Sequence, residues 1–531
     1  MSRWWKNFFA NIGKTQVNER TVGLLIDERA RCSGDSVFLV DPLSGEELTY
    51  QQLQQQAAAV ANFLVSRGVQ TGGSVAYAMN NGRDCAVCLL GILYGGFRAT
   101  AINLIAGSQS IGYVIAHSQA GIILTQKPHK PRLHEALEQS TYLDHVSADN
   151  TSPILVDVDE TFWSALPAAT TRSGAANSDD DALLMYTSGT TGRPKGVVLT
   201  HSNLIAGGDT VCQAHQLSST DRALCVLPLF HINGLCVTVM GPLVSGGSVV
   251  MADRFSTSSF WQWIRNHSCT WCSVVPTQIS YLLHAAADQP AGEQDFDSIR
   301  FARSASAPLA PDMHRAFEQQ FGIPVIETMG LTETAAQILS NPLPPAVRKI
   351  GSAGIAFGDE VIIGNKHGKE CARGETGEIR VRGPNVMTRY FRDPEVSQEA
   401  ITPDGWLCTG DLGTMDDDGY VFVTGRLKEL IIKGGENIAP REVDEALYHH
   451  VDVVEAAAFP CPCNDYGQRV EAAVMLKPGS KVKENELLGL CEQLLGKFKK
   501  PDRIHFLPEL PKGPSGKIQR LKLVEILCDC R

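Results

Sequence analysis

Apolar residues recur at helical spacing near the beginning of the chain. Four of them lie three or four positions apart: Leu53, Ala57, Val60 and Leu64. Residues 49–52, Thr-Tyr-Gln-Gln, place a threonine three positions before a glutamine, which is the form of a capping box. The pattern therefore predicts a helix that begins after Thr49 and ends before Gly68.

Short apolar runs alternate with longer amphipathic stretches through the first half of the chain. The runs predict strands at 74–78, 121–124, 223–227 and 248–251. The longer stretches predict helices at 84–94 and 260–267. Alternation of this kind is typical of an α/β fold with largely parallel sheets. Residues 168–181, rich in Ala, Thr, Ser and Asp, are predicted to form an exposed linker.

The pattern changes in the second half of the chain. Short strands with glycine turns are predicted at 374–382 and 419–423 and indicate a small β-rich subdomain. From Val451 onward an alternating pattern resumes, with strands predicted at 453–459 and 471–476 and a helix near 484–495. We therefore predict the α/β fold class: a large N-terminal domain of α/β subdomains with a small β-rich subdomain, followed by a small α+β C-terminal domain.

Residues 234–252 carry no charge over nineteen positions and raise the question of a membrane span. Gly241-Pro242 and the glycines at 246 and 247 interrupt this run, and a spanning helix needs about 20 uninterrupted apolar residues. We expect a buried helix followed by a buried strand, and no membrane span.

The composition excludes several classes of protein. At 531 residues the chain is longer than one hydrophobic core usually supports, which predicts two or more domains. Apolar residues make up 43% of the chain and charged residues 20%, as in ordinary soluble globular proteins. The formal net charge is −11 and no basic stripe is visible, which argues against a nucleic-acid partner.

The fifteen cysteines are scattered along a chain far longer than disulfide-stapled secreted domains. We expect reduced and mostly buried thiols. The pairs Cys461/Cys463 and Cys528/Cys530 have neither the spacing of a zinc site nor histidines nearby, which argues against a metal site.

The first fourteen residues contain no apolar run long enough for a signal peptide, so we expect the protein in the cytoplasm. Trp4 and Phe8 would share a helical face, as would Trp5 and Phe9. Two interpretations stay open: this face touches a membrane or a neighbouring subunit, or it packs on its own domain.

Residues 186–196, Tyr-Thr-Ser-Gly-Thr-Thr-Gly-Arg-Pro-Lys-Gly, are suited to holding a polyphosphate. Glycines let backbone N–H groups converge on an anion, hydroxyls add donors and the lysine adds charge. Apolar runs at 182–185 and 197–199 predict strands on both sides, joined by a hairpin-like flap. A plain surface turn is the alternative. The expected phosphate contacts are Thr187, Ser188, Gly189, Thr190, Thr191 and Lys195.

The loop is not a Walker loop, because Pro194 stands where that pattern needs glycine and Gly196 where it needs Ser or Thr. Instead it resembles the phosphate loop of the adenylate-forming superfamily, which includes acyl-CoA synthetases, adenylation domains and firefly luciferase. Further motifs follow in the family's order, from Leu48-Thr49-Tyr50 to Pro-Ser-Gly-Lys at 514–517, so the likeness covers almost the whole chain. It is most like a carboxylic acid–CoA ligase that uses ATP, Mg²⁺ and coenzyme A.

The resemblance implies roles for the charged residues. Lys517 resembles the family's catalytic lysine, which reaches from the C-terminal domain to the carboxylate and the α-phosphate; positive charge is what two reacting anions need. In the motif 328–333, Thr332 resembles the contact to the α-phosphate and Glu333 the ligand of Mg²⁺, a metal that prefers oxygen ligands.

It also implies a nucleoside site. Asp411 resembles the ribose-binding aspartate, whose two oxygens can accept from two hydroxyls, and Arg426 the second ribose contact. Met329 stands where the family usually has an aromatic residue against adenine, although a thioether still offers a polarizable contact. The remaining residues implied for this site are Ser306, Ala307, Pro308, Thr328 and Gly330.

Two positions bear on the acid substrate. His231 lies in a segment that resembles the one beside the acyl carboxylate, where adenylation domains for α-amino acids have an aspartate. A simple carboxylic acid is therefore expected rather than an amino acid. Ala305 stands where relatives commonly have glycine, and its methyl group favours a shorter acyl chain.

The resemblance divides the chain into residues 1–427 and a mobile domain of residues 428–531, with Lys428 as hinge. Gly435 would lie beside the pantetheine arm after the domain rotates, where a side chain would obstruct the thiol.

The acyl acceptor stays open between coenzyme A and the phosphopantetheine of an acyl carrier protein. A catalytically silent nucleotide-binding protein is the other alternative, against which the joint presence of Lys195, Glu333, Asp411 and Lys517 argues. The oligomeric state is left open.

Overall fold

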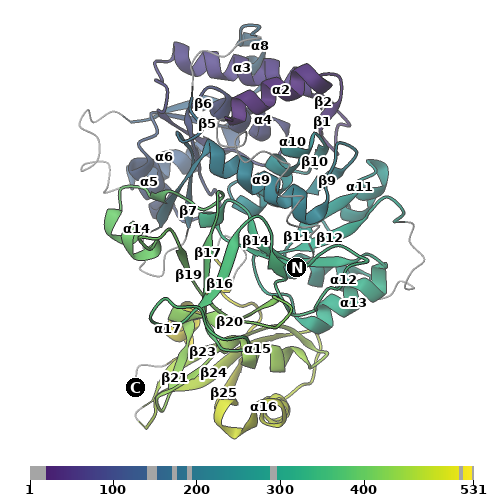
Figure 1. Ribbon diagram of the computed structural model, residues 1–531, viewed down its shortest axis with the longest axis vertical. Helices are drawn as coiled ribbons and strands as arrows, with labels where there is room; N and C mark the ends of the chain where they lie inside the picture. The colour runs from purple at the N-terminus through teal and green to yellow at the C-terminus, as the bar shows by residue number, and fades with distance from the viewer. Residues whose placement is uncertain are drawn as a thin grey trace.

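The computed structural model describes residues 20–139, 152–169, 176–187, 194–286, 296–463, 465–513 and 518–528. Within them the strands form four sheets. In Figure 1 the chain runs from the N-terminal layers at the top to the C-terminal elements at the bottom. The predicted mixture of α/β layers, a β-rich subdomain and a smaller C-terminal α+β domain is confirmed.

The largest sheet has nine strands in the order β15-β14-β13-β12-β11-β9-β10-β1-β2, and its centre from β13 to β1 is parallel. Its strands are β1 (Val37–Val40), β2 (Glu47–Thr49), β9 (Arg222–Cys225), β10 (Ser248–Met251), β11 (Trp271–Val274), β12 (Phe301–Ser304), β13 (Val325–Gly330), β14 (Gln337–Ser340) and β15 (Ile355–Ala356). The helices of this part are α9 (His201–His215), α10 (Gly241–Ser245), α11 (Phe260–Asn266), α12 (Pro276–Ala285) and α13 (Pro311–Phe321).

The second sheet has seven strands in the order β18-β8-β7-β4-β3-β5-β6. They are β3 (Ser74–Ala78), β4 (Arg98–Ala101), β5 (Ile122–Thr125), β6 (Ile154–Asp157), β7 (Asp181–Thr187), β8 (Lys195–Thr200) and β18 (Arg389–Tyr390). The helices before and around them are α2 (Val22–Ser33), α3 (Tyr50–Ser66), α4 (Arg83–Tyr94), α5 (Ser108–Ser118), α6 (Lys130–Glu138) and α8 (Glu160–Ala165). Thr49 and Gln52 form the predicted capping box of α3.

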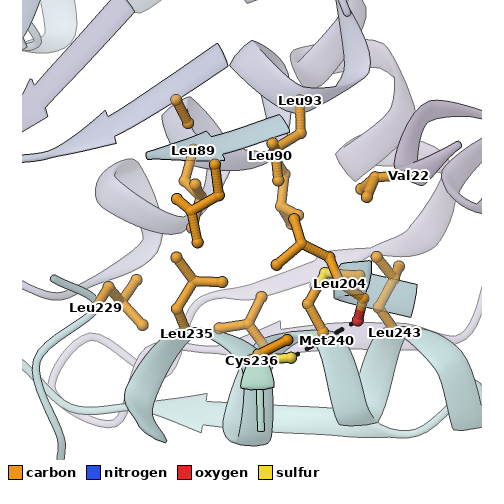
Figure 2. Close-up of a cluster of buried hydrophobic side chains, with 14 of the residues drawn as sticks. Val22, Leu89, Leu90, Leu93, Leu204, Leu229, Leu235, Cys236, Met240 and Leu243 are labelled. Atoms are coloured by element: carbon orange, nitrogen blue, oxygen red, sulfur yellow. Dashed lines mark hydrogen bonds between the residues drawn. The ribbon is translucent and has the colours of Figure 1, made fainter. Parts of the chain in front are cut away.

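The two large sheets share a core between their helices. Figure 2 shows leucines of α4 facing residues of α9 and of the π-helix η3 (Asn233–Met240). The Cys236 thiol donates to the Leu204 carbonyl at 3.6 Å. The uncharged stretch 234–252 is thus the expected buried helix and strand, although its first part winds as a π-helix, which apolar periodicity does not distinguish. Within the described residues, no helix is both long and apolar enough to cross a bilayer.

The β-rich subdomain and the C-terminal domain each have their own sheet. The first contains β16 (Glu360–Gly364), β17 (Gly377–Arg382), β19 (Leu407–Met415) and β20 (Val421–Arg426), with α14 (Pro394–Ala400) nearby in sequence. The second contains β21 (Ile431–Lys433), β22 (Glu436–Ile438), β23 (Val453–Cys463), β24 (Gly467–Leu476) and β25 (Arg503–Phe506), with α15 (Pro440–Tyr448), α16 (Glu484–Lys499) and α17 (Arg520–Leu527). The chain passes from one sheet to the other through the 3₁₀ turn Leu427–Glu429.

A buried ion pair attaches α17 to the rest of the C-terminal domain. Arg520 donates to Asp444 Oδ1 at 3.2 Å and to the Ala458 carbonyl at 2.8 Å, and also pairs with Asp444 Oδ2. The backbone N–H of Ala458 donates to Asp444 at 2.6 Å. Burial raises the pKa of Asp444, so its ionised form depends on this arginine.

Replacing Arg520 with alanine should therefore destabilise the C-terminal domain by about 3–5 kcal/mol, because Asp444 would stay buried without its cation. Hydrogen exchange of the β23 and β24 amides measures this loss. The double variant Arg520→Met, Asp444→Asn removes both charges and should lose much less. An equal loss in the single and the double variant would contradict the assignment.

Candidate active site

A cavity of about 310 Å³ lies between the N-terminal part and the C-terminal domain. The N-terminal wall contains the residues expected at the nucleoside: Ser306, Ala307, Pro308, Thr328, Met329, Gly330, Asp411 and Arg426. The opposite wall comes from α15, β23 and the start of α17, and includes Arg441, Asp444, Glu445, Glu455, Ile518 and Arg520. The structure thus brings together residues that are more than a hundred positions apart in the sequence.

The N-terminal wall is built at the carboxyl ends of two neighbouring parallel strands. β12 pairs with β13 in parallel, with Ser304 beside Glu327, and the cavity residues 306–308 and 328–330 follow at the same edge. Open α/β sheets bind ligands outside this edge. At Ser306 the backbone turns with φ 73°, a left-handed conformation that only a few per cent of non-glycine residues adopt.

Gly330 is required by backbone packing. A Cβ atom there would lie 2.1 Å from the carbonyl oxygen of Ala336, where β14 crosses back beside β13. No side chain fits at that distance. The role of Gly330 in this structure is therefore to let the motif turn at the cavity wall.

Asp411 and Arg426 face each other across the β19–β20 ladder, where they occupy paired positions. Arg426 Nε donates to Asp411 Oδ1 at 2.7 Å, and the Asp411 side chain is only 8% exposed. The Asp411 carboxylate raises the pKa of Arg426 further. One carboxylate oxygen of Asp411 thereby accepts from the arginine, and both residues border the cavity.

Glu333 accepts a hydrogen bond from Tyr390, a residue that the sequence analysis did not identify. The Tyr390 hydroxyl donates to Glu333 Oε1 at 2.8 Å, and the Lys195 ammonium lies 5.1 Å from the centre of the Tyr390 ring. Burial first, and then the Glu333 carboxylate, raise the pKa of Tyr390 far above its usual range, so the hydroxyl remains a donor. Tyr390 reaches this position because β18 pairs with β8, a pairing that no local sequence pattern predicts.

The phosphate loop is described only at its base. β7 and β8 are antiparallel and place Thr187 opposite Lys195, which confirms the predicted hairpin. Ser188, Gly189, Thr190 and Thr191 lie outside the described residues, and so does Lys517.

A single carboxylate at this place fits Mg²⁺. Among the described residues, no group of three or more His, Cys, Asp or Glu side chains could hold a metal ion by itself. Mg²⁺ is usually bound by one or two carboxylates together with the phosphates of a substrate. Glu333, near the Lys195 end of the phosphate loop, offers one such carboxylate.

Seven of the predicted site residues that the structure describes do not line the cavity: Thr187, Lys195, His231, Thr332, Glu333, Lys428 and Gly435. Thr332 begins the 3₁₀ turn Thr332–Thr334 with Glu333, and His231 lies before η3 with its ring 4.8 Å from that of Phe230. Gly435 lies in the exposed β21–β22 turn with φ 86°, a conformation that favours glycine. Lys428 is exposed in the turn that joins the last two sheets.

Glu327 lines the cavity and is a further residue that the sequence analysis did not identify. Its Oε1 accepts from the Leu309 N–H at 3.1 Å, whereas Oε2 is buried without a partner among the described residues. Burial raises the pKa of Glu327 to about 7. A buried acceptor in the cavity wall next to Thr328 suits the amino group of a base.

Comparisons with known proteins agree with this geometry. Residues 26–391 match the AMP-binding enzyme family, and residues 442–517 match the AMP-binding enzyme C-terminal domain. The chain is 46% identical over 511 residues to a sulfoacetate–CoA ligase of Cupriavidus necator, covering 95% of this chain and 97% of the relative. It is 35% identical over 480 residues to an oxalate–CoA ligase of Arabidopsis thaliana, covering 89% and 92%.

Solved structures are similar as well. ATP-bound MatB from Rhodopseudomonas palustris superposes with a TM-score of 0.86 at 29% identity, covering 96% of this chain and 99% of that chain. The o-succinylbenzoate CoA synthetase MenE from Bacillus subtilis, in complex with ATP and magnesium, gives 0.82 at 29% identity, covering 95% and 99%.

We expect Glu333 to bind Mg²⁺, and replacing Tyr390 with phenylalanine should then weaken that binding, because Glu333 loses the hydrogen bond from the hydroxyl while the ring beside Lys195 remains. Loss of such a supporting hydrogen bond typically weakens metal binding about 10- to 100-fold. Calorimetry of ATP binding over a range of Mg²⁺ concentrations measures this change. Tyr420→Phe, whose hydroxyl bonds to the Val347 carbonyl instead, is the matched control. An unchanged Mg²⁺ requirement would disprove the role of Tyr390.

Glu327 predicts a pH dependence of stability. Its native pKa of about 7 lies above the ordinary value of 4.5, so the native state binds this proton more tightly than the unfolded state. The resulting stabilisation is fully present below pH 4.5 and is lost as the pH rises through 7. Between pH 5 and pH 8, wild type should therefore lose up to about 3 kcal/mol relative to Glu327→Gln, which cannot titrate. Urea unfolding of both proteins without nucleotide measures this, and parallel pH profiles would refute it.

Proposed function

The chain belongs to the AMP-binding enzyme family, and from this premise we propose how its cavity activates a short carboxylic acid. The protein is an ATP-dependent acid–CoA ligase. It joins a carboxylate to the α-phosphate of ATP, giving acyl-adenylate and pyrophosphate, and then transfers the acyl group to the thiol of coenzyme A with release of AMP.

The observation that carries the assignment of residues is the composition of the two cavity walls. One wall holds the residues proposed for the nucleoside, and the other holds Ile518 and Arg520, which follow shortly after Lys517 in the sequence. We assign Lys517 to the carboxylate and the α-phosphate. Two anions that must approach each other need such a cation, and it acts only while the C-terminal domain faces the cavity.

The other assignments follow from positions in the site. Asp411 and Arg426 are proposed to hold the ribose, and the adenine is proposed to lie against Met329 and the backbone of 306–308. Thr187, Lys195 and the loop residues 188–191 are proposed for the phosphates, with Thr332 at the α-phosphate. Glu333 would hold Mg²⁺, which when bound neutralises phosphate charge. His231 is proposed to border the acyl carboxylate.

The domain rotation is part of the proposal. Residues 1–427 and 428–531 are proposed as the two moving parts, with Lys428 as hinge, because the chain changes sheet in the turn that contains this residue. Gly435 lies away from the cavity in the present arrangement. A rotation about Lys428 would bring another face of the C-terminal domain to the acyl-adenylate, with Gly435 beside the pantetheine arm.

The substrate is proposed to be a short carboxylic acid other than an α-amino acid. Histidine at position 231 offers no carboxylate for an ammonium group. Two relatives are named for sulfoacetate and oxalate, which are both short acids. We place the reaction in the cytoplasm, since the fourteen cysteines of the described segments are all free thiols.

The function is tested by incubating the protein with ATP, Mg²⁺, coenzyme A and a panel of acids, and by measuring pyrophosphate and acyl-CoA. The panel contains acetate, oxalate, malonate, sulfoacetate, propionate, hexanoate and glycine. Short acids should give both products and glycine neither. A parallel arm replaces coenzyme A with a phosphopantetheinylated carrier protein. Activity with glycine alone, or with hexanoate above all short acids, would overturn the substrate assignment.

Lys517→Ala should lower adenylation at least ~10²-fold, because the transition state loses a positioned charge. Thioester formation from presynthesised acyl-adenylate should be nearly unchanged, since the lysine has left the site by then. Both half-reactions are measured on the same preparation. Equal losses in the two would contradict the proposed alternation of the C-terminal domain.

A further inference from the structure

Arg303 is a cation buried in the middle of the largest sheet. It lies on β12, three residues before the cavity residue Ser306, and is only 2% exposed. Its Nε donates to Gln337 Oε1 at 3.0 Å, and its Nη1 donates to Asn233 Oδ1 at 2.7 Å and to Ser273 Oγ at 3.0 Å. All three acceptors are neutral.

No acidic side chain of the described residues pairs with Arg303. Other well-buried arginines of this protein do have carboxylate partners: Arg98 pairs with Asp181, and Arg520 with Asp444. The nearest acid along the neighbouring strand is Glu327, but it is paired in register with Ser304 rather than Arg303. Because side chains alternate along a strand, Glu327 and Arg303 point to opposite faces of the sheet.

The surrounding titratable groups supply no negative charge either. His215 contacts the same Gln337 oxygen at 3.2 Å, and burial together with Arg303 lowers its pKa to about 3, so it is neutral. Burial raises the pKa of the Cys236 thiol far above its usual range. Burial lowers the pKa of Arg303 to about 9, which leaves it protonated at neutral pH. The cluster is therefore positive and uncompensated, an unfavourable state for a buried charge.

The cluster is connected to the cavity by one side chain. Asn233, which accepts from Arg303, donates through Nδ2 to Ser306 Oγ at 3.1 Å. Ser306 lines the cavity. Within the described segments, Nη2 of Arg303 makes no hydrogen bond to a protein atom. The guanidinium of Arg303 thus places a hydrogen-bond donor and a positive charge next to the cavity wall.

We propose that Arg303 determines substrate specificity by pairing with a second anionic group, a carboxylate or a sulfonate, on the acid that the enzyme activates. This inference rests on the proposed function and narrows its substrate class to short acids with two anionic groups. The planar guanidinium matches the oxygens of either group. The substrate supplies the anion, so the charge of Arg303 is compensated only while the acid is bound.

The test compares matched acids on wild type, Arg303→Met, Arg303→Lys and Ser273→Ala. kcat/KM is measured by pyrophosphate release with oxalate against acetate, and with malonate and sulfoacetate against propionate. Wild type should prefer the acids with a second anion. Arg303→Met should lower kcat/KM for them at least ~100-fold, the usual effect of removing one partner of a buried charged pair. Its kcat/KM for acetate and propionate should stay within ~10-fold of the wild-type value. Retained activity with these two acids also shows that the variant folds correctly.

The remaining arms separate the possible outcomes. Arg303→Lys keeps the charge and should retain part of the preference. Ser273→Ala removes one neutral acceptor of Arg303 and one donor to Asn233 but no charge, and it should keep all of the preference. Comparing kcat/KM for oxalate with kcat/KM for sulfoacetate shows whether the enzyme prefers a carboxylate or a sulfonate as the second anion. Equal losses for all acids in Arg303→Met, or an unchanged preference, would overturn the role of Arg303 while leaving the ligase reaction intact. If wild type releases no pyrophosphate with any acid, the proposed function itself fails.

Discussion

The parallel pairing of β12 with β13 is the interaction on which the site depends. It fixes Ser304 beside Glu327, so residues 306–308 after β12 and residues 328–330 at the end of β13 lie at one edge of the sheet and form one wall of the cavity. The next strand, β14, returns antiparallel and comes so close that only glycine fits at position 330. This edge consequently determines where the cavity residues 306–308 and 328–330 lie relative to Glu333.

The same pairing separates two buried charges. Arg303 and Glu327 lie on adjacent strands, yet the alternation of side chains sends them to opposite faces. Neither forms an ion pair within the described residues: one carboxylate oxygen of Glu327 is buried there without a hydrogen-bond partner, and the hydrogen-bond acceptors of Arg303 are all neutral. Unpaired buried groups of this kind are unfavourable for folding and are characteristic of sites that await a ligand.

The opposite wall of the cavity belongs to the C-terminal domain rather than to the β12–β13 edge. The C-terminal domain has its own sheet and hydrophobic core, which includes Ile431, Val443, Leu447, Val470 and Leu487. It is attached to the N-terminal part through the short turn Leu427–Glu429, and Arg520 contacts both Glu429 of this turn and Asp444 of its own domain. A compact unit on a short connection can present different faces without losing its internal packing.

The sequence by itself determined the elements and the chemical inventory. Periodicity located α3 and its capping box, the strands at 74–78 and 248–251 and the buried stretch after Gly234, because these signals depend on neighbours a few residues apart. The motifs located the residues proposed for ATP. Only the tertiary structure decided which distant residues meet: Tyr390 with Glu333 and Lys195, Glu327 with Leu309, and Arg303 with Asn233, Ser273 and Gln337. The physical reason is that burial and charge compensation depend on strand pairing between segments far apart in the chain, and no local pattern records which strands will be neighbours.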